Sequence, residues 1–129
     1  MNEKTINNWL ELARYDLDTA SAMLSSGRYL YVSFTCQQAI EKLLKAIFVK
    51  KKNCTPPYTH NLIRLCEEIG LMAELSQKQL AFIEQLCSYY IQSRYTEEIQ
   101  RLSVALTKEM ASSMYHETGE LFAWLSQKI

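Results

Sequence analysis

The sequence contains little of what most folds use to make turns. Its 129 residues include only three glycines and two prolines, so few sharp reversals and long regular segments are expected. With so few glycines, the chain has no glycine-rich loop that could bind the phosphates of a nucleotide. No apolar run approaches the roughly 18 residues that cross a membrane, and the N-terminal MNEKTINNWL has no apolar signal core. We therefore expect a helix-rich protein that does not enter the membrane.

Net charge and metal-binding patterns are also missing. Fourteen basic residues balance fourteen acidic ones, so no overall field draws the chain to nucleic acid, and any such contact must be a local patch. The four cysteines form no CxxC pair and have no histidine at ligand spacing, which argues against zinc. Three of them fall at apolar positions, which favours buried free thiols and a cytoplasmic location. We expect no metal and no cofactor.

The segment Tyr29–Lys52 has the clearest helical periodicity in the chain. Its apolar residues recur every three or four positions, as in an amphipathic helix with one buried stripe. On the opposite, polar side we place Gln38, Glu41, Lys42 and Lys45, with Glu41 and Lys45 at the spacing of an exposed ion pair. This polar side is our candidate face for recognising a partner.

Further helices are predicted before and after this segment. We expect them over 5–26, over 60–69 with Thr59 as its cap, from a Ser76-x-x-Gln79 capping box onward, and over 107–127. The expected inner face of the last helix consists of Met110, Met114, Leu121, Phe122 and Leu125. Residues 95–106 show no clean period and are predicted to be a loop or a broken helix. The fold class is all-α, an antiparallel up-and-down bundle of four to five helices forming one domain over residues 1–129.

Few side chains could support chemistry. His60 and His116 are far apart, and neither has a partner at the spacing of a nucleophile and its base, so no catalytic residue is assigned. We expect His60 to hydrogen-bond within the loop before the third helix and to hold that loop in place. Arg94 continues the apolar stripe of the fourth helix and precedes Tyr95, which makes it a candidate to bind a phosphate or a partner carboxylate with both guanidinium arms.

Several strings, taken together, resemble a known family. They are the opening helix with Trp9, Ala13, Asp16 and Leu17; Gly27-Arg28-Tyr29; Phe34-x-x-Gln37-Gln38-Ala39-x-Glu41-Lys42-x-x-Lys45-Ala46; Pro57 with Thr59-His60-Asn61-Leu62; and Ser93-Arg94-Tyr95. Across nearly the whole chain this order resembles the HEPN family of helical domains of prokaryotes and eukaryotes. The QQAxEKxxKA string is its most specific part.

The resemblance implies a helical bundle that pairs as a homodimer. Family members are often encoded beside a minimal nucleotidyltransferase, in pairs that look like toxin and antitoxin, and several cut RNA without a metal. The signature of those nucleases is an arginine followed, after four to six residues, by a histidine. Arg94 matches the arginine, but the corresponding positions are Ile99, Gln100 and Arg101, none of which is an imidazole base or acid.

Three functions remain open on this basis. The first is a non-catalytic HEPN protein that binds nucleotide or RNA phosphate through Arg94, Tyr95 and Arg101 and forms a complex with a minimal nucleotidyltransferase. The second is a metal-independent endoribonuclease toxin with a degenerate motif. The third is a protein-interaction module that binds no ligand and docks its partner through the polar face of the second helix.

Overall fold

The computed structural model describes residues 2–90 and 96–129, and this part of the chain is helical without any strand. Its elements are α1 (Asn2–Ser25), α2 (Tyr29–Lys52), α3 (Leu62–Glu68), α4 (Gln77–Cys87), α5 (Thr96–Ala105) and α6 (Lys108–Ser126). The predicted all-α class is therefore confirmed, with six helices in the described part where four to five were expected. None of these helices combines the length and the apolar character that a membrane crossing requires.

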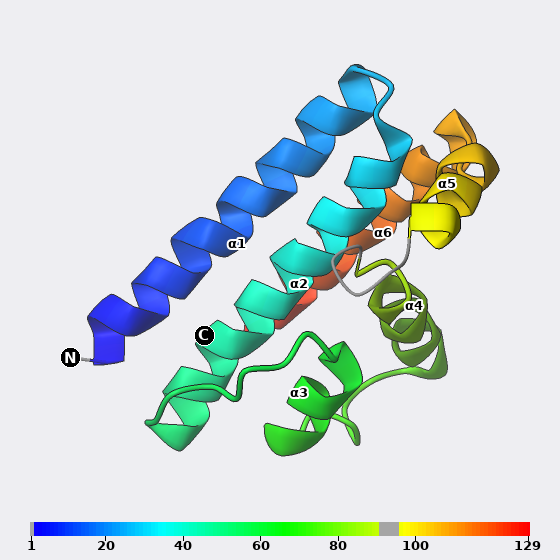
Figure 1. The fold of residues 1–129 in the computed structure, drawn as a ribbon. Coiled ribbons are helices and arrows are strands. Elements are labelled where there is room, and N and C mark those ends of the chain that lie inside the picture. Colours follow the sequence, from blue (N-terminus) through cyan, green and yellow to red (C-terminus); the bar gives the residue numbers. More distant parts are fainter. Residues whose placement is uncertain (1, 91–95) are drawn as a thin grey trace.

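The first two helices form a long antiparallel pair that lies side by side in Figure 1. The reversal depends on Gly27, whose φ of +77° lies in the left-handed region that glycine adopts at little cost. The Arg28 amide then donates a hydrogen bond of 2.8 Å to the Met23 carbonyl and closes the end of α1. The antiparallel pairing and the bounds of α2 agree with the prediction.

The second helix is the centre of the bundle. It packs against α1, α3, α4, α5 and α6, and Figure 1 shows α6 running along its far side. Fifteen of its 24 residues are buried, so α2 has no open polar side and the predicted two-sided helix is wrong. Glu41 and Lys45 are only 3% and 6% exposed, and Gln38 and Lys42 are half-buried.

The ends of α3 and α4 are held by side chains and glycine. Ser76 and Gln79 form the predicted capping box at the start of α4. At α3 the cap is Asn61 rather than Thr59, because the Asn61 Oδ1 accepts hydrogen bonds from the backbone amides of Ile63 and Arg64. The helix therefore begins later than predicted. Gly70 follows it at a φ of +70°.

The end of the chain departs from the prediction at two points. Residues 96–105, expected to form a loop or broken helix, form α5, whose first turn carries Glu97 and Glu98 at the end where the helix dipole favours acids. None of its residues is buried. On α6, Met114, Leu121, Phe122 and Leu125 are buried as expected, whereas Met110 is 44% exposed, because the side of the helix that carries it is not covered.

Candidate functional site

A cluster of polar side chains lies inside the bundle around Glu41. The Glu41 carboxylate accepts hydrogen bonds from Lys45 Nζ at 3.1 Å, from Gln37 Nε2 at 3.2 Å and from His60 Nδ1 at 2.9 Å. A buried carboxylate is costly unless it is paired and hydrogen-bonded. Three donors meet that requirement here, and the ammonium of Lys45 also lies 5.5 Å from the centre of the Trp9 ring.

His60 joins this cluster to the surface. Because its Nδ1 donates to a carboxylate, its Nε2 is left as an acceptor, and the Tyr90 hydroxyl lies 2.7 Å from it. The two rings also stack, with centroids 3.9 Å apart, and the exposed Tyr58 meets His60 edge-on at 5.6 Å. Burial, helped by the nearby charge of Glu41, raises the pKa of Tyr90. His60 thus contacts both α2 and the segment that follows α4.

A shallow groove of about 480 Å³ opens beside this histidine. It is lined by His60, Asn61, Ile63, Glu84, Cys87 and Tyr90. No cationic side chain lines it, so its chemistry does not suit a phosphate. In the described part of the chain, no three or more His, Cys, Asp or Glu side chains are grouped so that they could hold a metal ion.

The residues predicted as an exposed recognition face make contacts within the bundle. Lys42 Nζ donates to the Asp16 carboxylate of α1, and Gln38 Nε2 donates to Gln37 Oε1 at 2.6 Å. Glu41 and Lys45 do form the expected ion pair, but they form it in the interior. The predicted exposure of this set was wrong because α1 and the α2–α3 loop cover the side of α2 that carries it.

Of the three predicted phosphate-binding residues, only one can be located. Arg94 and Tyr95 lie outside the described residues. Arg101 is exposed on α5, where it lines a shallow groove of about 510 Å³ together with Glu97, Gln100, Val104 and Ala105. This surface and the His60 groove have no lining residue in common.

Sequence reasoning missed the link between Glu41, His60 and Tyr90. The two partners of His60 lie 19 residues before it and 30 residues after it, and helical periodicity carries no information at such separations. The available signal was local: Glu41 is followed by Leu43, Leu44 and Ile47, and an acidic residue inside so apolar a stretch needs buried partners.

The helices and this cluster define an all-helical bundle whose central helix carries a buried polar network. A family model for the HEPN domain matches residues 6–129, and the chain therefore belongs to the HEPN domain family. Its fold is similar to that of TT1696 from Thermus thermophilus, a crystal structure with a TM-score of 0.82 and 23% sequence identity over 100% of both chains. No curated protein matches the chain significantly.

Proposed function

We propose that this chain is a non-catalytic HEPN protein that binds a nucleotide or RNA phosphate through Arg94, Tyr95 and Arg101. In this proposal it acts as a homodimer and forms a complex with a minimal nucleotidyltransferase partner, as in toxin–antitoxin pairs. Two copies of the arginines near the dimer axis would concentrate positive charge in a chain whose net charge is zero.

The observation that carries the proposal is the position of Arg101. Its side chain is exposed on α5, a helix with no buried residue, at the edge of a groove. A guanidinium in such a place can bind a phosphate with two parallel N–H donors. The segment with Arg94 directly precedes α5 in sequence, so both arginines belong to the same stretch of chain.

The absence of catalysis is supported by the two histidines. At four to six residues beyond Arg94 the chain has Ile99, Gln100 and Arg101, none of which transfers protons near neutral pH. His116 is exposed on α6, 3.4 Å from a Glu120 carboxylate oxygen. His60 is hydrogen-bonded to Glu41 and lies against Tyr90.

A metal-independent endoribonuclease is the second candidate, and the geometry of His60 favours it. A carboxylate that orients an imidazole at the edge of a groove is the arrangement general bases use. In this alternative, His60 replaces the histidine missing from the Arg94 motif.

RNA binding tests the first candidate. We expect Arg101→Ala and Arg94→Ala each to weaken binding of a single-stranded RNA and to lower the slope of log K against log salt by about 0.7 per phosphate contact. Arg14→Ala, which removes an exposed arginine of α1, is the matched control and should leave both unchanged. Equal affinity for all four proteins would refute the proposal.

An RNA cleavage assay with a chelator present separates the two candidates. Intact RNA is the result expected for a non-catalytic protein. Cleavage that Arg94→Ala and His60→Gln each abolish, with helix content retained, would instead establish the nuclease. Sedimentation of the protein alone and with a co-expressed nucleotidyltransferase tests the homodimer and the complex.

A further inference from the structure

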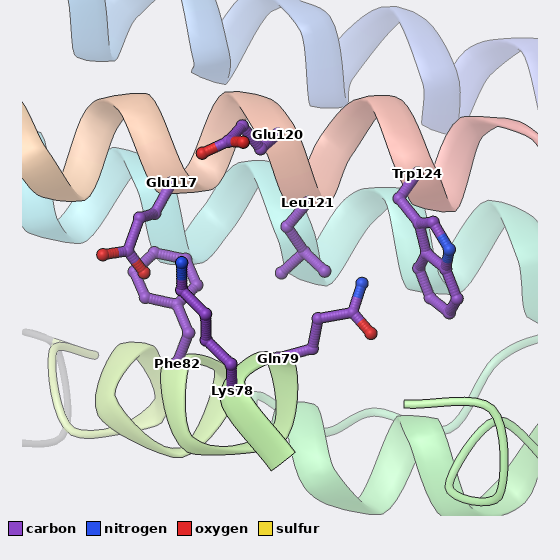
Figure 2. A pocket seen from close by; sticks show the side chains of 7 residues that line it. All are labelled: Lys78, Gln79, Phe82, Glu117, Glu120, Leu121 and Trp124. Carbon is purple, nitrogen blue, oxygen red and sulfur yellow. The ribbon is translucent and has the colours of Figure 1, made fainter. Parts of the chain in front are cut away.

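A continuous groove runs between α4 and α6. One hollow, of about 290 Å³, is lined by Lys78, Phe82, Glu117, Glu120, Leu121 and Trp124, among others (Figure 2). A second, of about 370 Å³, shares Phe82 and Glu117 with the first and extends to Glu109, Met110 and Met114. Because the two hollows share these residues, they form one surface, which we call the α4–α6 groove.

The floor of the α4–α6 groove is apolar. Figure 2 shows Phe82 rising from α4 while Leu121 and Trp124 reach across from α6. Phe82 and Leu121 are only 6% and 4% exposed, whereas Met110 at the other end is 44% exposed. An exposed methionine continuous with aromatic side chains is typical of surfaces that bind apolar partner groups.

The rim of the α4–α6 groove is acidic. Glu109, Glu117 and Glu120 line it, against the single cation Lys78. Glu120 lies beside His116, and within the described part of the chain neither Glu109 nor Glu117 forms an ion pair. The rim therefore carries negative charge that a partner can neutralise.

We propose that the α4–α6 groove docks a basic amphipathic helix of a partner protein. Its apolar face would lie on Phe82, Leu121 and Trp124, and its lysines or arginines would meet the glutamates of the rim. Along α6, Glu109 and Trp124 are 15 residues apart, which at the helical rise is about 22 Å. A partner helix of about four turns fits that length.

A second copy of this chain is a poor occupant of the groove. A two-fold symmetric contact places the same patch of both subunits face to face. Here that would set Glu117 and Glu120 of one copy against the same residues of the other, with like charges opposed. The charge pattern favours a different, cationic partner, and this surface is independent of the arginines in the proposed function.

Tryptophan fluorescence offers a direct test, because Trp124 lines the groove and the other tryptophan, Trp9, is on α1. The probe is a synthetic amphipathic peptide of about 16 residues, free of tryptophan, with leucines on one face and lysines on the other. Comparison peptides carry glutamate in place of every lysine, or the same residues in scrambled order. We expect the basic peptide to change the emission of the natural protein and of Trp9→Phe, and to leave that of Trp124→Phe unchanged.

Charge variants complete the test. We expect the double variant Glu117→Gln with Glu120→Gln to bind the basic peptide about fivefold more weakly at low salt. Glu3→Gln with Glu11→Gln removes the same charge from exposed positions of α1 and should bind as the natural protein does. The proposal is overturned if the acidic or scrambled peptide binds as well as the basic one, if both double variants lose affinity equally, or if no peptide binds.

Discussion

Replacing Glu41 with glutamine should destabilise the fold by about 3 kcal/mol, because it leaves a charge buried without its partner. Glu41 and Lys45 are 3% and 6% exposed. The amide that replaces the carboxylate has one acceptor oxygen and an NH₂ group, and it faces three donors from Gln37, Lys45 and His60. The change in volume is negligible, so no cavity contributes to this cost.

The magnitude follows from the burial of Lys45. Removing one partner of a buried pair typically costs about 3–5 kcal/mol, and we take the lower end because the Trp9 ring still lies 5.5 Å from the ammonium. For a domain of this size the loss corresponds to a decrease in Tm of about 10 °C. Urea unfolding followed by far-UV circular dichroism measures it, with the exposed Glu11→Gln as a control that should stay within about 0.5 kcal/mol.

A double-mutant cycle decides whether the pair is the cause. Lys45→Met alone should also destabilise, because it leaves Glu41 without its cationic partner. The double variant should lose less than the sum of the two single variants, by about 1–3 kcal/mol. Additive losses, within about 0.5 kcal/mol, would refute the coupling that we infer between these buried charges.

Three further predictions concern helix ends and thiols. Ser76→Ala should cost about 1 kcal/mol in urea unfolding by breaking the capping box of α4, and a loss no larger than that of an exposed Ser25→Ala control would contradict the role of the cap. Gly70→Ala should cost about 1 kcal/mol from backbone strain alone, since its φ is +70° and an added Cβ meets nothing within 4 Å; an unchanged unfolding midpoint would show that the turn relaxes. Burial raises the pKa of Cys36 to about 11 and that of Cys66 to about 12, so both thiols stay protonated near neutral pH. In alkylation followed by mass spectrometry, the exposed Cys54 should react first, and early labelling of Cys36 or Cys66 would argue against their burial.

The sequence was informative wherever the cause of a feature is local. The bounds of α2, the left-handed glycines at positions 27 and 70 and the capping box at Ser76 each depend on a few neighbouring residues. Periodicity failed for α2 because a central helix is covered on all sides. Its polar residues lie at positions that an isolated amphipathic helix would expose, and only the loop that delivers His60 reveals why they can be buried.

The helix α5 was missed for a related reason. Its residues are exposed or half-buried, so the sequence has no continuous apolar stripe to reveal the helical period. The outer position of Met110 was missed because an apolar residue at helical spacing looks the same whether it faces the core or an open groove. Both errors fall on surfaces to which we now assign binding, where local pattern and burial are expected to disagree.

The strings that identify the family have a structural explanation in this chain. Asp16 pairs with Lys42, Glu41 binds Lys45 and His60, and Asn61 caps α3. These contacts join the opening helix, the QQAxEKxxKA string and the His-Asn-Leu segment into the central packing of the bundle. Such residues specify how the helices assemble, and a shared fold does not by itself fix a shared activity. What distinguishes this chain functionally must then lie on its exposed surfaces, which is why Arg101 and the α4–α6 groove are the places to test.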